Sequence, residues 1–432
     1  MNRKILCLTI AALASTPVLA LDEASVLQRL EQLEQQRQAD QAEIDALKKQ
    51  VRSLTSSTAP SSLSSSEAQQ LQEQIVKVDD KAKRRNASLK RQLKQEKEKL
   101  KVNGFMSVYA VRSTVDGVDL GIGVDDSWGF SPDTIVGLQF DYSLADNLDA
   151  VIQLTSKGKN DFDTEAEWAF LRYQATDDLT LRGGRLRLPF YMYSESIEVG
   201  YAYPWVRPPV EMYSTMITTY EGVDASYQFT LGNWINTAKV YYGSIDLDTV
   251  EVDDLAGAEF ITENGPWTLR AAYSYFDSLT PTGSPLEGNA KYSVLGARYD
   301  DGEWFALLEA SDGVLGSSLP VLGTESYTGT LGYQFDKFMP YVVYSKTYSN
   351  SEHEKNVEGL PVEQSVDQES YTLGLKYNAT PQVVLKGEAV HYDGFDGTLG
   401  EIGADLVANP GLRNKLDDDG VTVMSLGFDL VF

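Results

Sequence analysis

Charged side chains that could handle ions gather in one stretch of the chain. Arg182, Arg185 and Arg187 precede residues 189–218, a segment rich in tyrosine and proline. Three carboxylates and a fourth arginine lie inside that segment, at Glu195, Glu198, Glu211 and Arg207. Guanidinium and carboxylate groups bind charged partners through strong charge-assisted hydrogen bonds. The pattern therefore predicts a site that selects ions or charged solutes.

The residues needed for catalysis are scarce elsewhere. The chain of 432 residues has only two histidines and one cysteine. His353 falls in a predicted outer loop, and His391 has no evident nucleophile to activate. A nucleophile elbow, a phosphate-binding loop and a His-Glu-x-x-His motif are all missing from the sequence. We expect no enzyme activity, no cofactor and no metal site, and the net charge of -26 argues against a nucleic-acid partner.

Residues 1–20 have the features of a secretory signal peptide. Basic residues are followed by a short apolar stretch and then by small residues at a cleavage site. The stretch is too short for a transmembrane anchor, which must cross roughly 30 Å of hydrocarbon. We expect the mature chain to begin near Leu21 and to work outside the cytoplasm. It then lacks cysteine, because Cys7 lies in the leader.

Two helical segments are predicted next. Residues 21–54 follow a heptad pattern with one polar layer, Arg37 and Asp40, which predicts a short coiled coil. Residues 55–66 are rich in serine and form a predicted hinge. Residues 67–100 form a second helical segment with a basic run near its end. That run is either a solvated helix face or a contact with anionic lipid head groups or the cell wall.

From residue 101 onwards the pattern has period two. Val136, Leu138 and Phe140 alternate with small or polar residues, and the polar faces of other segments carry arginine or lysine. Apolar and charged faces that alternate in this way are typical of a transmembrane β-barrel, with lipid outside and water inside. The predicted fold class is an all-β transmembrane barrel, residues 101–432, of about sixteen antiparallel strands preceded by the α-helical coiled coil.

The connections between predicted strands alternate between tight turns and long, mostly acidic loops. This alternation predicts that both chain ends lie in the periplasm. Fourteen or eighteen strands fit the length nearly as well, and the eighth strand has the weakest pattern. The predicted strands span residues 102–113, 133–143, 147–157, 165–175, 178–188, 219–229, 233–243, 254–263, 266–276, 290–300, 303–311, 324–335, 337–349, 367–378, 381–392 and 420–432.

The fifth strand and the segment after it predict the constriction of a pore. The leucines change phase at Gly183-Gly184, which suggests a β-bulge that turns the later arginines to the lumen. A rigid aromatic and proline-rich segment suits a position folded inward against the barrel wall. The expected constriction consists of Arg182, Arg185, Arg187, Glu195, Glu198, Arg207 and Glu211. The expected lumen wall carries Arg172, Lys239, Arg270, Arg298, Lys376 and Lys386. Pairing of each arginine with a neighbouring carboxylate is the structural alternative.

The last strand ends on an aromatic residue. Phe428, Leu430 and Phe432 fall on one face of this strand. Together with the signal peptide, this face resembles the assembly signal of bacterial outer-membrane barrels. The resemblance implies that the barrel-assembly machinery is a partner.

The run from Gly184 to Phe190, with the inward-folding segment after it, resembles the motif of the phosphate-selective porin family and its relatives. The resemblance implies a trimeric, sixteen-stranded outer-membrane channel, and the coiled coil is similar to that of members with a periplasmic N-terminal extension. One departure concerns selectivity. Only 19 basic residues but 50 acidic residues follow Lys101, whereas phosphate-selective members have basic lumens. Phosphate selectivity is therefore not expected.

These patterns predict a porin for the passive diffusion of small hydrophilic solutes, with a preference for anionic or carboxylated ones. The preference is expected because charges are screened beyond about 8 Å at physiological salt, so nearby arginines outweigh remote acidic loops. The expected partners are outer-membrane lipid, lipopolysaccharide and further copies of the chain in a homotrimer, with the N-terminal helices in the periplasm. The alternative is a structural tether whose coiled coil contacts the peptidoglycan of the cell wall.

Overall fold

The computed structural model describes residues 42, 46, 49, 99–115, 123–213, 217–247, 250–281, 287–315, 323–349, 366–394 and 420–432. The chain divides into two units, residues 1–98 and 99–432. In the first unit the described residues Ala42, Ala46 and Lys49 are helical. The predicted signal peptide and hinge lie outside the described residues, as do nearly all of the predicted coiled coil and of the second helical segment, residues 67–100. At the end of that second segment Lys99 is helical, but Leu100 already belongs to the first strand. Within the described ranges, no helix has both the length and the apolar character needed to cross a membrane.

In the described part of the second unit, the strands are accompanied by four short helical turns. The strands are β1 (Leu100–Ser113), β2 (Ile135–Ala145), β3 (Leu148–Lys157), β4 (Thr164–Gln174), β5 (Leu179–Arg187), β6 (Thr219–Leu231), β7 (Trp234–Asp246), β8 (Val250–Asn264), β9 (Trp267–Pro281), β10 (Gly288–Asp300), β11 (Trp304–Leu315), β12 (Thr324–Tyr333), β13 (Phe338–Ser349), β14 (Asp367–Thr380), β15 (Val383–Asp393) and β16 (Val421–Val431). The helical turns are η1 (Gly158–Asn160), η2 (Ser194–Ser196), η3 (Gly200–Ala202) and α4 (Val210–Tyr213).

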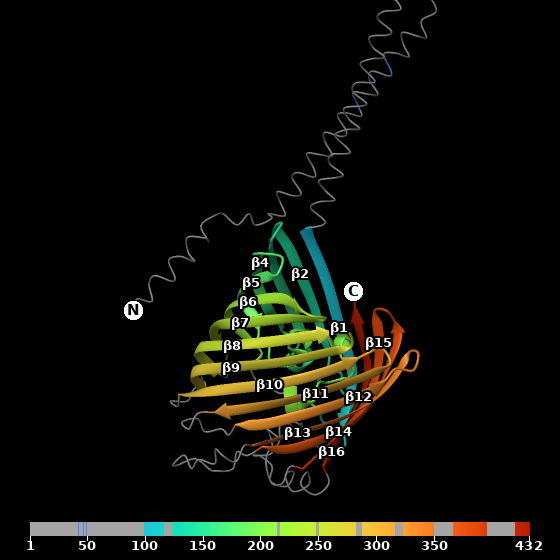
Figure 1. The fold of residues 1–432 in the computed structure, drawn as a ribbon. Coiled ribbons are helices and arrows are strands. Elements are labelled where there is room, and N and C mark those ends of the chain that lie inside the picture. Colours follow the sequence, from blue (N-terminus) through green and yellow to red (C-terminus); the bar gives the residue numbers. More distant parts are fainter. Residues whose placement is uncertain are drawn as a thin grey trace, which may run out of the picture. The chain divides into compact units, whose positions relative to one another are not determined.

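The strands close into one antiparallel barrel (Figure 1). Each strand pairs with its neighbours in the chain, and β16 pairs with β1 to complete the wall. The prediction of sixteen strands is confirmed, including the weakly patterned eighth. The largest differences from the predicted bounds are the start of β8, the end of β9 and the end of β11. Strands β8 and β9, which pair with each other, extend further than predicted because Val250 pairs with Pro281 and the side chain of Val252 is fully buried.

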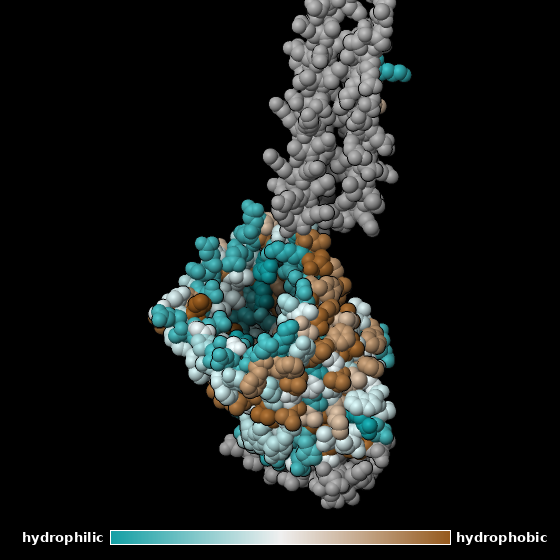
Figure 2. Space-filling view, turned by 90° about the vertical axis from the view of Figure 1, so that its right-hand side faces the viewer, coloured by the Kyte–Doolittle hydropathy of each residue, from teal (hydrophilic) through white to brown (hydrophobic). Residues whose placement is uncertain are grey.

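The two faces of the wall differ in character. On the outer face Leu295 and Leu308 are 65% and 63% exposed, while their chain neighbours Val294 and Leu307 are buried inside. Figure 2 shows apolar residues over much of the outer wall and a hollow lined by hydrophilic residues. This is the arrangement that a barrel with lipid outside and polar groups inside requires.

Beside the short turns, exposed aromatic residues pair with half-buried tyrosines. Such rings are suited to a membrane interface, where one side is apolar and the other is hydrated. The pairs, with ring centroids 4.9, 4.8 and 4.7 Å apart, are Trp267–Tyr299, Trp304–Tyr333 and Phe338–Tyr377.

Candidate constriction site

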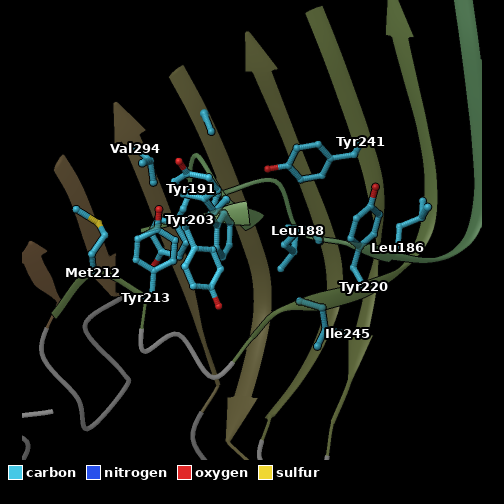
Figure 3. Packing of buried hydrophobic residues seen from close by; sticks show 14 of the residues in the cluster. Leu186, Leu188, Tyr191, Tyr203, Met212, Tyr213, Tyr220, Tyr241, Ile245 and Val294 are labelled. Carbon is cyan, nitrogen blue, oxygen red and sulfur yellow. The ribbon is translucent and has the colours of Figure 1, made fainter. Parts of the chain in front are cut away.

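The segment after β5 folds into the barrel. We call residues 188–213 the inner segment; it includes η2, η3 and α4. Its prolines restrict the backbone, and its rings supply a large apolar surface. Its buried aromatic residues are Phe190, Tyr191, Tyr193, Tyr203, Trp205 and Tyr213. Figure 3 shows Leu188, Tyr191, Tyr203 and Tyr213 inside the strands that they pack against.

These rings contact both the wall and one another. The Phe190 ring lies 4.9 Å from the Tyr292 ring of β10, and Tyr191 lies 4.6 Å from Tyr213, both measured between centroids. The indole of Trp205 donates a hydrogen bond of 3.0 Å to Thr330 Oγ1 on β12. The inner segment is therefore held by an apolar core inside the barrel.

The register of β5 is continuous, in contrast to the predicted bulge. Its pairs with β4 and β6 run without a shift through Gly183 and Gly184. Gly184 has a φ of 139°, a backbone conformation that residues other than glycine rarely adopt. Leu186 and Leu188 do not face lipid, since both are fully buried in the interior cluster.

Glu195 of η2 connects the inner segment to the wall near β5 and β7. Its carboxylate lies 3.2 Å from Arg182 Nη2 and 3.0 Å from Lys239 Nζ. The same two cations also pair with wall carboxylates, at 2.7 Å to Asp224 and 2.9 Å to Glu259. These contacts form a continuous chain of alternating charges.

The Glu195 carboxylate stays ionised at neutral pH. Burial would raise its pKa, but Lys239 and Arg182 lower the pKa to about 2. The side chain is nevertheless 46% exposed, more than any other partner in this chain of charges. It is therefore the carboxylate here that a passing solute can contact.

Glu198 forms a second bridge to the wall. It lies 3.0 Å from Lys157 on β3 and 3.2 Å from Arg187 on β5. Arg187 also lies 3.2 Å from Glu167, and Lys157 forms an ion pair with the same carboxylate. All four side chains of this group are well buried, whereas the group around Glu195 has one exposed member, Glu195 itself.

The other predicted constriction residues lie apart from these two groups. No ion pair among the described residues includes Arg185, whose strand neighbours are Ala169 and Glu221. Arg207 pairs with Asp133 at 2.8 Å. The Glu211 carboxylate accepts a hydrogen bond of 2.7 Å from Gln368.

The predicted lumen-wall residues have three kinds of surroundings. Arg172 pairs with Asp149 at 3.0 Å, and Lys239 and Arg270 pair with Glu259. Arg298 donates to Thr268 Oγ1 at 3.4 Å, and Lys376 lies over the Tyr201 ring at 5.6 Å. Lys386 is fully buried against the inner segment.

Four members of the two charge groups are not among the site residues predicted from the sequence. Three are acidic, Glu167, Asp224 and Glu259, and one is basic, Lys157. Alternation could have found Asp224, because it follows Val223, which is exposed on the outer face, and so faces inward. Asp429 was likewise hidden between Phe428 and Leu430.

The two groups together are electrically balanced. They contain five basic side chains, Lys157, Arg182, Arg187, Lys239 and Arg270, and five acidic ones, Glu167, Glu195, Glu198, Asp224 and Glu259. The arrangement can therefore present paired charges of both signs to a solute, rather than an excess of one sign.

Comparisons with known proteins identify solved structures of the same fold. No protein-family model and no curated protein sequence matches the chain. Similar solved structures include a loop-deletion mutant of OmpT, an outer membrane protein of Vibrio cholerae (TM-score 0.52, 12% identity, covering 77% of this chain and 100% of that one). An anion-selective porin from Comamonas acidovorans has a TM-score of 0.52 at 14% identity, covering 77% and 99% of the two chains. OmpF of Salmonella typhi, in complex with daunomycin, has a TM-score of 0.51 at 13% identity, covering 77% and 97%. The likeness shows that the fold is shared with these outer-membrane barrels.

Proposed function

We propose that this protein is an outer-membrane porin, a water-filled channel through which small hydrophilic solutes diffuse passively. The observation that carries the proposal is the inner segment, which bears Glu195 and Glu198 and places them against basic residues of a closed barrel. A closed wall with an apolar exterior suits a membrane-spanning channel. Opposed charges at a narrow point give it a means of choosing among solutes.

The preference of the channel is for anionic or carboxylated solutes. The balanced charge groups supply no excess of either sign, so the preference depends on other inward-facing cations. Arg298 and Lys376 have no ion pair among the described residues, and both are only half-buried. Their charge acts on a solute within the roughly 8 Å screening length, whereas acidic loops beyond that length act weakly.

The chain assembles as a homotrimer in the outer membrane, with its N-terminal helices in the periplasm. A heptad seam of about 25 residues needs partner helices to bury it, because short isolated helices are marginal in water. Membrane lipid and lipopolysaccharide surround the barrel, and the barrel-assembly machinery inserts it.

Planar-bilayer recording tests the channel directly. The purified protein is added to a bilayer, and the reversal potential is measured in a salt gradient at several salt concentrations. We expect stepwise conductance and a reversal potential on the anion side. Absence of any conductance from correctly folded protein would refute the porin, and cation preference at every salt concentration would refute the anion preference.

The tether is the second candidate, and the heptad pattern of residues 21–54 favours it. Deletion of residues 21–100 separates the two functions. A porin keeps conducting without this part, although its trimer is weakened. A tether loses its attachment to peptidoglycan, which is measured by the amount of protein that sediments with isolated cell wall.

A further inference from the structure

Lys386 on β15 has three acceptors where the inner segment meets the barrel wall. Its side chain is fully buried, and its ammonium group lies 2.8 Å from Asp429 Oδ2. The same group donates hydrogen bonds of 2.7 Å to the Gly200 carbonyl and 2.6 Å to the Trp205 carbonyl. Asp429 also accepts a hydrogen bond of 2.7 Å from the hydroxyl of Tyr109. An ammonium group has three N–H donors, and all three are used here.

The partners of Lys386 come from parts of the chain that meet only in the finished barrel. Asp429 belongs to the last strand, β16, and Tyr109 belongs to the first, β1. Gly427 lies opposite Lys386 on one side and opposite Tyr109 on the other. The acceptor carbonyls belong to the inner segment. Lys386 therefore joins the inner segment to the seam where the barrel closes.

The inner segment touches the wall closely at this point. A side chain at Gly200 would meet Ser107 Oγ at 2.7 Å and would also collide with the Asp429 carboxylate. Contacts of that length are far inside the normal van der Waals distance. A larger residue would displace these side chains, so the inner segment packs directly against the seam at Gly200.

We infer that Lys386 is a positioning residue that sets the aperture of the channel by holding the inner segment against the seam strands. The inference rests on the proposed function. Buried carbonyl groups without a donor are costly, because they lose hydrogen bonds that water would otherwise provide. Without Lys386, the Gly200 and Trp205 carbonyls regain hydrogen bonds by moving into water. The segment then leaves the wall and opens a second path beside it.

The first experiment separates aperture from barrel stability. Lys386→Met leaves Asp429 as an unpaired buried charge, whereas Lys386→Met combined with Asp429→Asn removes both charges. We expect both variants to show higher single-channel conductance and a larger sugar-exclusion limit in liposome swelling. Heat-modifiability on gels should fall in the single variant and recover in the double variant. A purely structural role predicts that the aperture recovers together with the stability.

A second variant reaches the same contact without changing any charge. Gly200→Ala pushes the segment away from Ser107, and we expect it to enlarge the exclusion limit as well. Ala202→Ser is the matched control in η3, because Ala202 is exposed. Arg172→Met is the control for loss of a lumenal cation, because the recorded ion pairs of Arg172 are with wall residues only.

The outcomes distinguish the inference from the proposed function. Failure of the unmodified protein to conduct would refute the porin itself. Normal conductance together with an unchanged exclusion limit in the double variant and in Gly200→Ala would refute only the role of Lys386. An equal enlargement in Arg172→Met would also refute it, because the effect would then follow from charge and not from position.

Discussion

Arg182 on β5 lies directly opposite Asp224 on β6, and its guanidinium Nη2 is 2.7 Å from the carboxylate Oδ2. The Asp224 side chain is almost fully buried. The wall therefore fixes the position of Arg182 by itself, and Glu195 adds a second carboxylate from the lumen side. The difference in burial matters for selectivity, because the exposed carboxylate of Glu195 can be removed while the buried carboxylate of Asp224 still holds Arg182 in place.

Glu195→Gln should make the channel more anion-selective. Arg182 keeps Asp224 and Lys239 keeps Glu259, so only the exposed negative charge is lost. One unit charge acting over about 4 Å in water is worth about 1 kcal/mol, or roughly a fivefold change in the anion-to-cation permeability ratio. Reversal potentials in a salt gradient measure this ratio.

The control for this variant is Glu303→Gln, which removes an exposed carboxylate in the short turn between β10 and β11. It should leave the permeability ratio within error of the native value. Equal shifts in the two variants would show that total charge, and not the position of Glu195, governs selectivity.

The selectivity of the native channel should change little with pH between neutral and about 4. Glu195 has a pKa of about 2, below the roughly 4.3 of an unperturbed glutamate. Because the pKa of Glu195 is depressed in the folded barrel, its carboxylate keeps its charge and its ion pairs at every pH above the unperturbed value. Both are lost only as the pH falls through the folded value of about 2. Reversal potentials across this range measure it. A midpoint near 4.3 that disappears in Glu195→Gln would contradict the prediction.

The sequence predicts the strands well because, within each strand, apolar side chains that face lipid alternate with side chains that face the interior. Leu295 faces outward and Val294 inward, and the alternation needs no knowledge of distant residues. Ion-pair partners cannot be predicted from local alternation, because they lie far apart in the sequence. Glu195 meets Lys239 across 44 positions and Lys386 meets Gly200 across 186, so the pairing depends on barrel closure and on the path of the inner segment.

The prediction of a β-bulge at Gly183-Gly184 was wrong for a related reason. Leu186 and Leu188 look like lipid-facing residues under the rule that apolar side chains point outward. In this barrel they point into an apolar core that the aromatic inner segment brings inside. The rule holds for a wall that faces water, and this part of the wall faces tyrosine and tryptophan rings.

Arg187→Met should destabilise the folded barrel strongly. Arg187 is 3% exposed and pairs with Glu167 and Glu198, which would share only Lys157 after the change. Breaking a buried ion pair from one side costs about 3–5 kcal/mol. The free energy of unfolding in urea, with refolding into detergent micelles, measures the loss.

Arg172→Met is the matched control for this loss, because Arg172 is 38% exposed and also pairs with two carboxylates. An exposed pair is worth less than about 1 kcal/mol. A loss of similar size in both variants would indicate that the Arg187 pairs are hydrated and contribute little.

Phe432→Ala should impair insertion into the outer membrane while leaving secretion intact. The backbone of Phe432 exchanges two hydrogen bonds with Gly104 of β1, at 2.8 and 2.9 Å, and these remain in the variant. Phe432 as a whole is 66% exposed, so loss of its ring removes little packing from the finished barrel. The ring is therefore available for recognition before closure.

Leu426→Ala is the matched control, since Leu426 is 64% exposed on the same strand. The amount of heat-modifiable barrel in outer-membrane fractions measures insertion. Normal amounts for Phe432→Ala, or an equal reduction for Leu426→Ala, would show that the terminal ring has no special part in assembly.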